Sequence, residues 1–325
     1  MSIKHAKTLL ITGGTGSLGR AILLRAHEEG WESVENGTIT VVSRDETKQA
    51  HLRNTYPRVR FRLGDIRDPN WMNLIFRNQQ AVVHAGAYKR VPSAEVNASE
   101  TMKTNIDGSY NVVQAALFGG AEVVVGISTD KACRPENMYG ASKRAMESLF
   151  QQANIFGDTR FTLARYGNVI GSTGSVIPLF TRLAESGKPI TITHMQMTRF
   201  WITLDQAVDL VVTAGGGETM PGTIVVPKAP GMSMYSLAEL FAEEKDLPIQ
   251  EIGIRPGEKI HEMMVSPAES LHTRSTDAHF LISPPSNHVT SNLPELFSYT
   301  SNKPSYVLTK DNMRDLIESW KQRHG

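Results

Sequence analysis

The chain has 325 residues, of which 40% are hydrophobic and 21% charged, and its formal net charge at neutral pH is +1. This balance is typical of a globular protein with a large core, and a charge near zero excludes a general attraction to nucleic acid or to an anionic membrane. The single cysteine, Cys133, excludes an intrachain disulfide, and no segment reaches the roughly 18–20 apolar residues that span a bilayer. We therefore expect a cytoplasmic protein with no membrane span, no metal site and no nucleic-acid partner.

Short apolar runs alternate with amphipathic stretches through the first half of the chain. The predicted strands are Thr8–Thr12, Thr38–Ser43, Val59–Leu63, Ala81–His84, Glu122–Ser128 and Arg160–Tyr166. The predicted helices between them are Leu18–Glu29, Asp45–Tyr56, Trp71–Asn78, Glu100–Phe118 and Glu136–Ala153. Strands and helices that alternate in this way pair in parallel through right-handed crossovers. The pattern predicts an α/β fold with a doubly wound parallel Rossmann sheet.

The alternation becomes irregular after Tyr166, where loops rich in Gly, Ser and Pro appear. This change favours a smaller, mostly C-terminal substrate-binding lobe over the carboxyl edge of the sheet, where ligands bind in open α/β folds. Asp205–Ala214 has the pattern of a helix that returns to the first domain. The predicted domains are therefore 1–167 with 200–227, and 168–199 with 228–325.

A glycine-rich turn follows the first predicted strand and opens the first predicted helix. Gly13, Gly16 and Gly19 have the G-x-x-G-x-x-G spacing. Such a turn lets a pyrophosphate approach the N–H groups at a helix N-terminus, which predicts a dinucleotide cofactor. The residues predicted to line this part of the site are Gly13, Thr15, Gly16, Ser17, Leu18 and Gly19.

The end of the second predicted strand indicates which dinucleotide is bound. Ser43 and Arg44 come before Asp45, and Lys48 lies one helical turn further on. A guanidinium suits a ribose 2′-phosphate, which favours NADP, whereas Asp45 alone would favour NAD or act as a helix cap. Further cofactor contacts are predicted at Asp65, Ile66, Ala85, Gly86, Ala87, Asn105, Tyr139 and Lys143.

Tyr139 and Lys143 form a Tyr-x-x-x-Lys pair at the start of the helix after the fifth predicted strand. Residues four apart share a helix face, so the ammonium is expected near the phenol, where it lowers the pKa of the phenol. The same spacing recurs at Tyr299/Lys303 and Tyr306/Lys310. Only Tyr139 follows a strand of the predicted sheet, so it is the expected catalytic phenol.

Thr129, Asp130 and Lys131 end the fifth predicted strand. The Thr129 hydroxyl is placed to bond the same substrate oxygen that Tyr139 deprotonates. An added acid and an added base at this edge suit an elimination rather than a simple oxidation. The alternative is that Asp130 caps a helix and Lys131 is a surface charge.

Several long segments resemble the inverting UDP-N-acetylglucosamine 4,6-dehydratases that begin pseudaminic acid synthesis, within the extended short-chain dehydrogenase/reductase superfamily. The matching segments are TGGTGSLG, SRDETKQ, AYKRVPSAE, KTNIDGSYNVV, STDKA, MYGASK, RYGNVIGSTGSVIP, MTRFWITL and IRPGEKIHEMM. The resemblance implies a hydro-lyase with tightly bound, recycled NADP that acts on UDP-N-acetylglucosamine as a homo-oligomer, either a dimer or a hexamer.

The resemblance also implies a role for each matching site residue. Tyr139, with Lys143, takes the proton from O-4 while NADP takes the hydride from C-4. Lys131, as a neutral amine, removes the proton from C-5, and a protonated Asp130 donates to the departing C-6 hydroxyl. The residues implied to hold the sugar, diphosphate and uridine are Lys89, Asn168, Arg199, Arg255 and Glu258.

Two other functions remain open at this point. An epimerase of UDP-N-acetylhexosamines, or a bifunctional dehydratase and epimerase, would retain Tyr139 and Lys143 and use Lys131 differently. An NADP-sensing regulator on the same fold would be expected to lose the phenol or the lysine. The joint presence of Thr129, Asp130 and Lys131 favours the dehydratase over both.

Overall fold

The computed structural model describes residues 1–172, 174–285, 292 and 295–324, so Thr173, in one of the matching segments, lies outside the described residues. A sheet of nine strands forms the larger domain. Its parallel strands are β1 (Thr8–Thr12), β2 (Thr38–Ser43), β3 (Arg60–Leu63), β4 (Ala81–His84), β5 (Val123–Thr129), β6 (Arg160–Tyr166) and β10 (Ile224–Pro227). The antiparallel strands β15 (His279–Ile282) and β14 (Thr273–Ser275) extend it beyond β10. The order across the sheet is β14-β15-β10-β6-β5-β4-β1-β2-β3.

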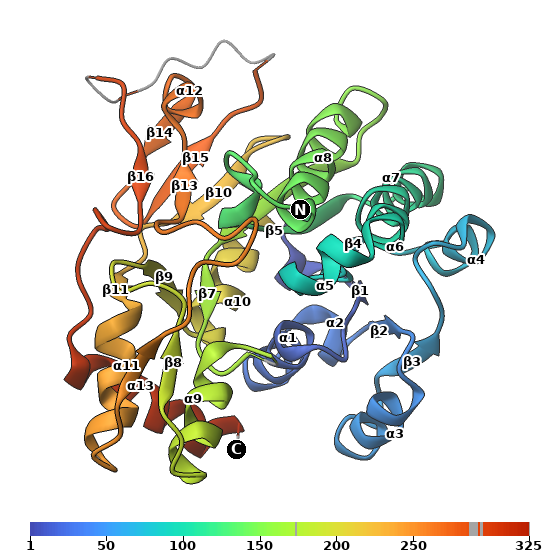
Figure 1. Cartoon of the computed structure of the whole chain (residues 1–325). Coiled ribbons are helices and arrows are strands. Elements are labelled where there is room, and N and C mark those ends of the chain that lie inside the picture. Colours follow the sequence, from blue (N-terminus) through green and yellow to red (C-terminus); the bar gives the residue numbers. More distant parts are fainter. Residues whose placement is uncertain (173, 286–291, 293–294, 325) are drawn as a thin grey trace.

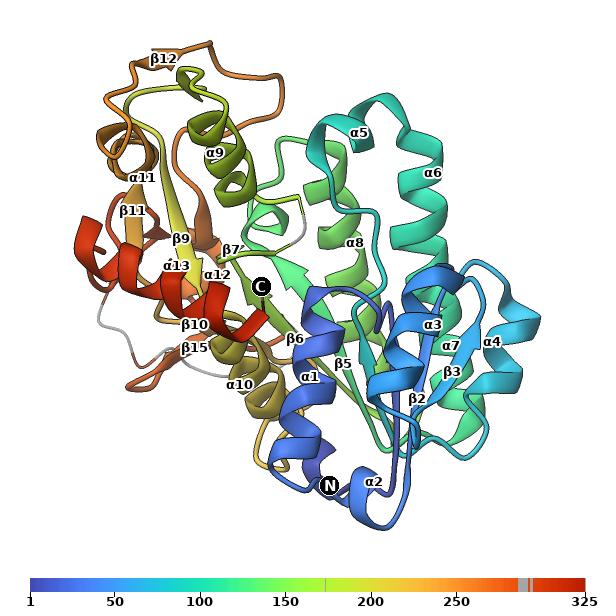
Figure 2. The same cartoon turned by 90° about the horizontal axis from the view of Figure 1, so that it is seen from below.

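Helices cover both faces of this sheet, because successive side chains of a strand point to opposite sides. In β1, Leu10 belongs to one core cluster, whereas Leu9 and Ile11 belong to another. The first cluster is covered by α4 (Pro69–Ile75), α7 (Gly108–Gly119) and α8 (Met138–Ala153). The second is covered by α1 (Ser17–Glu28), α3 (Glu46–Thr55) and α10 (Leu204–Ala214), and α1 and α10 lie side by side (Figure 2). The predicted doubly wound Rossmann sheet is confirmed.

The predicted helix Glu100–Phe118 consists of three consecutive helical elements. They are α6 (Ala98–Met102), the π-helical turn η2 (Lys103–Asp107) and α7. The last ends at Gly120, which has a φ of 70°. A π-helical turn inside a helix often marks a functional site, and here it carries Asn105.

The smaller lobe has its own core and lies beside the sheet (Figure 1). Its strands form a three-stranded sheet of β11 (Gly231–Ser233), β9 (Thr198–Ile202) and β7 (Asn168–Val169), and the pairs β12 (Ile249–Glu251) with β8 (Ile190–Ile192) and β13 (Met263–Val265) with β16 (Tyr299–Thr300). Its helices are α9 (Val176–Glu185), α11 (Met234–Glu243), α12 (Pro267–Ser270) and α13 (Lys310–His324). The core of the lobe includes Phe180, Trp201 and Leu237. The remaining short elements are η1 (Ile3–His5), α2 (Glu32–Glu35), α5 (Val91–Val96) and η3 (Asp130–Ala132).

The division between the two domains differs from the sequence-based prediction in two segments. Residues 200–202 were assigned to the sheet domain, but they belong to β9 of the smaller lobe. The range 228–325 was assigned to the smaller lobe, but β14 and β15 within it belong to the main sheet. The reason is that β15 pairs edge to edge with β10, which buries Phe280 and Ile282 on the sheet. Among the described residues, no helix combines the length and the apolar character that crossing a membrane requires.

Candidate active site

The glycine turn joins β1 to α1 and brings the chain against the loop that follows β4. Gly13 has a φ of 67°, and a Cβ placed on it would lie 2.7 Å from the backbone of Gly86. Gly16 is the N-cap of α1 and provides no side chain to bond the first N–H groups of the helix. These features fit a dinucleotide pyrophosphate at the N-terminus of α1.

The side chain of Asn105 bonds the loop after β4, and its polar atoms have protein partners. Its side chain is buried, with Oδ1 accepting from the Tyr88 N–H at 2.7 Å and Nδ2 donating to the Tyr88 carbonyl and to Ser142 Oγ, both at 2.9 Å. The amide therefore ties the loop after β4 to α8. The structure shows a supporting position for Asn105, because its side-chain donors and acceptor have protein partners, and its predicted cofactor contact stays a prediction.

The residues at the end of β2 form a partly charged edge next to β3. Asp45 is the N-cap of α3, where its Oδ1 accepts from the Lys48 N–H at 2.9 Å. Arg44 is 55% exposed, and its Nη1 lies 3.7 Å from Asp65 Oδ2. Asp65 pairs more closely with Arg67, at 2.6 Å. Arg44 is thus held only weakly by the protein and has an exposed guanidinium, while Asp45 is occupied as a helix cap.

The end of β5 brings Thr129, Asp130 and Lys131 into one buried cluster. Thr129 Oγ1 donates to Asp130 Oδ1 at 2.9 Å, and Lys131 Nζ lies 3.1 Å from the same oxygen. The Asp130 side chain is 1% exposed and that of Lys131 is 20% exposed. Lys131 is therefore a buried ion-pair partner that still opens to one side of the site, and the alternative of a surface charge is wrong.

Tyr139 stands in the first turn of α8, directly against this cluster. A Cβ on Gly140 would lie 2.2 Å from the Lys131 carbonyl oxygen, so only glycine lets α8 approach so closely. Thr129 and Lys131 both lie close enough to Tyr139 to stabilise its phenolate. The phenol, the acid and the amine thus meet at the carboxyl end of β5, as the sequence predicted.

Lys143 occupies a different position from the one expected. Its Nζ lies 2.9 Å from Met146 Sδ in a buried site, and burial lowers the pKa of Lys143 to about 7. Burial raises the pKa of Tyr139 to about 12, and the cation that opposes this shift is Lys131 rather than Lys143. The predicted lowering of the phenol pKa by Lys143 is therefore not seen in this structure, because desolvation outweighs the nearby charge.

The ionisation of the cluster agrees with the expectation for Asp130 and differs from it for Lys131. Burial raises the pKa of Asp130, which favours the protonated acid. Burial opposes the charged form of Lys131, but Asp130 and Glu262 outweigh it and raise the pKa of the amine. The expected neutral amine is thus an ammonium in this structure, because two carboxyl groups face it.

A profile of the family described as "Polysaccharide biosynthesis protein" matches residues 9–284. The chain is 43% identical, over 290 residues, to an inverting UDP-N-acetylglucosamine 4,6-dehydratase of Campylobacter jejuni, covering 86% of this chain and 84% of the relative. The chain belongs to this polysaccharide biosynthesis protein family, with the inverting dehydratase as a relative. The resemblance identified from the sequence is thereby confirmed.

A second relative and a solved structure are also similar to this chain over most of its length. A UDP-glucose 4-epimerase of Rickettsia rickettsii is 39% identical over 272 residues, which cover 81% of this chain and 79% of the relative. The X-ray structure of Pen from Bacillus thuringiensis superposes with a TM-score of 0.89 at 32% identity, and the match covers 98% of this chain and 99% of that one. The family therefore includes chains named as dehydratases and as epimerases, and the site residues must distinguish them.

The family segment that ends IRPGEKIHEMM folds over the start of α8. Arg255 to Glu258 form a turn in which the Glu258 N–H donates to the Arg255 carbonyl at 3.0 Å. Asn137, the N-cap of α8, donates to the Gly257 carbonyl at 2.8 Å and accepts from the Gly140 N–H at 2.8 Å. Asn137 thus holds the turn to the helix that bears Tyr139, a role that the sequence analysis missed.

The predicted substrate residues come from four segments around this cluster. Arg199, on β9, is buried, and its Nη1 donates to the Thr198 and Ile260 carbonyls at 2.7 and 3.1 Å. Its Nη2 lies 3.6 Å from Glu258 Oε1. Asn168 is half-buried on β7, which pairs with β9, while Lys89 and Arg255 are exposed. The structure therefore links Arg199 to Glu258 directly but shows no bond between Lys89 and these groups.

Glu262 is a buried carboxylate of the cluster that sequence reasoning did not single out. Its Oε1 lies 3.0 Å from Lys131 Nζ and 3.8 Å from Arg199 Nε. The only sequence signal was its place in a segment that resembles the family. Glu262 follows His261 and is not part of any recognisable spacing. Nothing in the sequence pairs it with Lys131, which lies far from it along the chain.

The two other Tyr-x-x-x-Lys pairs lie outside the site, as predicted. Tyr299 is on the short strand β16, and its hydroxyl donates to the Ala229 carbonyl at 2.7 Å. Tyr306 is 52% exposed. Neither tyrosine stands on a helix, so the four-residue spacing does not bring its lysine onto a shared helix face.

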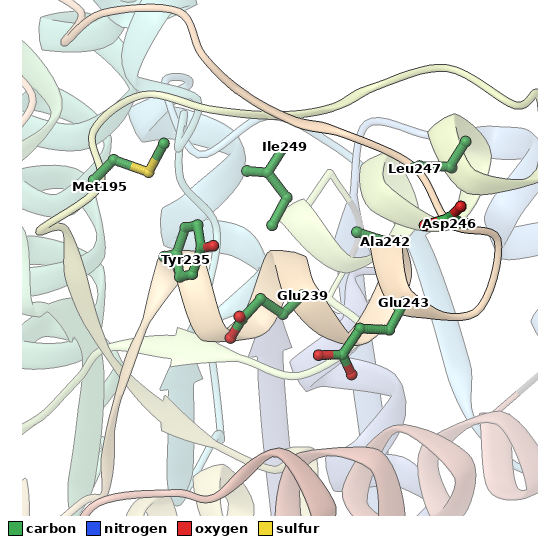
Figure 3. Close-up of a pocket in the computed structure, with 8 residues that line it drawn as sticks. All are labelled: Met195, Tyr235, Glu239, Ala242, Glu243, Asp246, Leu247 and Ile249. Atoms are coloured by element: carbon green, nitrogen blue, oxygen red, sulfur yellow. The ribbon is translucent and has the colours of Figure 1, made fainter.

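A surface pocket of about 330 Å³ lies on the smaller lobe between α11 and the loops next to β8 and β12 (Figure 3). Its lining is Met195, Tyr235, Glu239, Ala242, Glu243, Asp246, Leu247 and Ile249. None of the predicted site residues lines it, and its three carboxylates do not suit a diphosphate. The cluster at the end of β5 therefore remains the candidate active site.

Proposed function

We propose that the protein catalyses the 4,6-dehydration of UDP-N-acetylglucosamine with inversion at C-5, giving a UDP-4-keto-6-deoxy-L-arabino-hexosamine. The observation that carries the proposal is the buried cluster of Asp130, Lys131 and Tyr139, which provides an acid, an amine and a phenol within one site. An epimerase needs the phenol, but it has no evident need for an acid and an amine beside it. The similarity to the Campylobacter dehydratase supports the same choice.

Each residue of the cluster has a step in the proposed reaction. Tyr139 takes the O-4 proton as the phenolate, the form that Lys131 and Thr129 stabilise, and Thr129 bonds the same oxygen as the ketone forms. The ketone acidifies the C-5 proton, which Lys131 removes, while protonated Asp130 donates to the departing C-6 hydroxyl. A bound nicotinamide would supply the hydride chemistry between C-4 and C-6.

The proposed substrate binding uses the cations around this cluster. Arg199 and Arg255 would hold the diphosphate, with Glu258 on the uridine ribose and with Lys89 and Asn168 toward the sugar. A protein with a net charge of +1 has no overall field to attract a diphosphate, so local guanidinium groups must bind it.

Incubation of the purified protein with UDP-N-acetylglucosamine tests the proposed reaction. We expect a 4-keto-6-deoxy sugar nucleotide to form without added cofactor and without a net change in absorbance near 340 nm. The reason is that the hydride removed at C-4 returns at C-6 in the same turnover. Stoichiometric accumulation of reduced cofactor would indicate a dehydrogenase instead.

We infer that the nicotinamide cofactor is NADP, which is tightly bound and recycled. Arg44→Ala should weaken NADP binding about 10- to 100-fold and leave NAD binding almost unchanged, because a charge-assisted bond to the 2′-phosphate is worth about 1.5–3 kcal/mol. Calorimetric titration of both cofactors measures the difference. Arg58→Ala, at an exposed arginine on the loop before β3, is the matched control. Equal losses for NADP and NAD would show that Arg44 does not recognise the phosphate.

We further propose that the protein works in the cytoplasm as a homo-oligomer, a dimer or a hexamer, with a product destined for pseudaminic acid synthesis. Exposed apolar side chains support self-association: Phe118 at the end of α7 is 79% exposed, and Ile155 and Phe156 beyond α8 are 75% and 63% exposed. Apolar patches of this kind mark protein contacts. Sedimentation analysis of the purified chain would report the oligomeric state.

A further inference from the structure

Glu262 and Lys131 form a close ion pair at the bottom of the active site. Glu262 Oε1 lies 3.0 Å from Lys131 Nζ, and the Glu262 side chain is 2% exposed. Its other oxygen, Oε2, is buried and has no hydrogen-bond partner, and the same is true of Asp130 Oδ2. Buried polar atoms are almost always bonded, so two unpartnered carboxyl oxygens beside one amine indicate groups that exchange protons or meet a ligand.

The charged groups around this pair come from several segments of the chain. Lys131 faces Asp130, Glu262 and Arg199, and it also influences Tyr139. Glu262 faces Lys131, Arg199, Lys259 and Asp130.

These neighbours fix the charge of each member of the pair. Burial opposes the ionised form of Glu262, but Lys131 and Arg199 outweigh it and lower the pKa of that carboxyl. In the resting cluster an ionised Glu262 therefore lies beside a protonated Lys131, while burial raises the pKa of Asp130 toward the acid form.

This resting state lacks one feature that the proposed reaction needs. In the proposed reaction Asp130 carries the proton for the departing hydroxyl, and the raised pKa of its buried carboxyl favours that form. Lys131 carries a proton as well, so it has no lone pair to take the C-5 proton. The ammonium must lose a proton first, and the buried acceptor at 3.0 Å is Glu262.

We propose that Glu262 takes the proton of Lys131 when substrate covers the site, so that Lys131 becomes the neutral amine that removes the C-5 proton. The inference rests on the proposed function, and it adds a positioning residue that acts through Lys131. The driving force is the loss of water from the Lys131 ammonium. The Lys131 side chain is 20% exposed, whereas that of Glu262 is 2% exposed and has little water to lose. A sugar over the cluster removes the remaining water from the ammonium, and loss of water favours a neutral acid and amine over a separated ion pair.

The proton balance closes with this transfer. Lys131 Nζ gives a proton to Glu262 Oε1, and its freed lone pair then takes the proton from C-5. Asp130 gives its proton to the C-6 hydroxyl, which leaves as water. Lys131 passes the C-5 proton to Asp130, 3.1 Å away, which restores the acid. When product leaves, Glu262 returns its proton to Lys131, which restores the ion pair. The O-4 proton taken by Tyr139 balances the proton that returns to C-5 from the opposite face.

The pH dependence of the elimination step tests the proposal. In single turnovers, the decay of reduced-cofactor absorbance reports elimination and hydride return, separately from the earlier hydride removal. The wild-type decay should be almost independent of pH between about pH 6 and pH 9, because the proton of Lys131 stays inside the protein. A wild-type decay that rises about tenfold per pH unit would overturn the proposal, since Lys131 would then lose its proton to solvent.

Two substitutions separate proton transfer from a structural role. Glu262→Gln keeps the shape but cannot accept the proton, so elimination should slow about 100-fold near neutral pH and recover as the pH rises. Glu262→Asp keeps the carboxylate and should eliminate slowly with the flat profile of the wild type. An equal loss at every pH in both variants, or a near-normal rate in Glu262→Gln, would contradict the proposal.

The same experiment distinguishes this inference from the proposed function. Glu244→Gln, at an exposed glutamate just beyond α11, is the matched control and should behave as the wild type. If the wild type forms an epimer without losing water, the proposed function is wrong. If the wild type dehydrates its substrate but Glu262→Gln does so normally, only the role of Glu262 is wrong.

Discussion

Lys131→Ala should remove the hydride at C-4 yet fail to eliminate, whereas Tyr139→Phe should not move the hydride at all. Lys131 is the amine that faces the reacting carbon in the proposed reaction, and a positioned base contributes about 10²–10⁴-fold to a rate. We therefore expect elimination to fall at least about 100-fold in Lys131→Ala. Single-turnover absorbance near 340 nm should show reduced cofactor that persists in the first variant and none in the second.

Residues of the other two Tyr-x-x-x-Lys pairs provide matched controls for Lys131→Ala and Tyr139→Phe. Lys303→Ala and Tyr306→Phe alter the other Tyr-x-x-x-Lys pairs, which lie outside the site, and both variants should retain full activity. A melting curve of Lys131→Ala checks that the buried carboxyl groups left without a cation do not unfold the protein. Near-normal elimination by a folded Lys131→Ala would show that the lysine has only a structural role.

Arg165→Met should destabilise the protein by about 3–5 kcal/mol, because it leaves buried carboxylates without their cation. Arg165 is fully buried on β6, and its guanidinium bonds Glu147 of α8 at 2.8 Å and Glu269 of α12 at 2.7 Å. It also donates to the Met264 carbonyl at 2.8 Å. The network joins the sheet, the helix of Tyr139 and the smaller lobe. Chemical denaturation measures the loss.

Acid should reduce the loss of stability that Arg165→Met causes. Burial opposes the ionised form of Glu269, but Arg165 and Ser266 outweigh it and lower the pKa of that carboxyl from 4.5 to about 2. The carboxylate thus stabilises the fold above about pH 4.5 and loses that contribution as the pH falls toward 2.

The difference between Arg165→Met and the wild type should therefore narrow in acid. Arg314→Met breaks the exposed pair with Asp311 and should cost less than about 1 kcal/mol. If Arg165→Met lost less than about 1 kcal/mol of stability, and the loss did not change with pH, the proposed role of the Arg165 network would be wrong.

The parallel sheet was predicted closely because its strands are short apolar runs bounded by turn residues. β1, β2, β4 and β6 begin and end where the sequence predicted. Their side chains are buried on both faces, which requires continuous apolar sequence and leaves little ambiguity. Strands β14 and β15 have shorter runs that fit either domain, so their pairing with β10 was not visible in the sequence.

The catalytic cluster could be predicted in part, for a similar reason. Thr129, Asp130, Lys131 and Tyr139 are close in sequence, and the end of one strand and the next helix bring them together. Glu262, Asn137 and Arg165 act through contacts with distant segments, as when Asn137 bonds the turn at Gly257. Single-sequence reasoning has no spacing rule for such pairs. It also predicted the pKa of Tyr139 from the neighbouring lysine, without the burial that controls that pKa. The neutral amine of Lys131 was implied by the family resemblance, and the sequence did not reveal the second carboxylate, Glu262, that favours the ammonium.

The configuration of the product at C-5 tests the central claim most directly. The proposed reaction removes the C-5 proton with Lys131 and returns a proton to the opposite face of the sugar. Proton NMR of UDP-N-acetylglucosamine incubated with the purified protein in D₂O should therefore show a 4-keto-6-deoxy product with deuterium at C-5 and the L-arabino configuration. A product with the D-xylo configuration, or a 4-epimer that keeps its C-6 hydroxyl, would contradict the assignment as an inverting dehydratase.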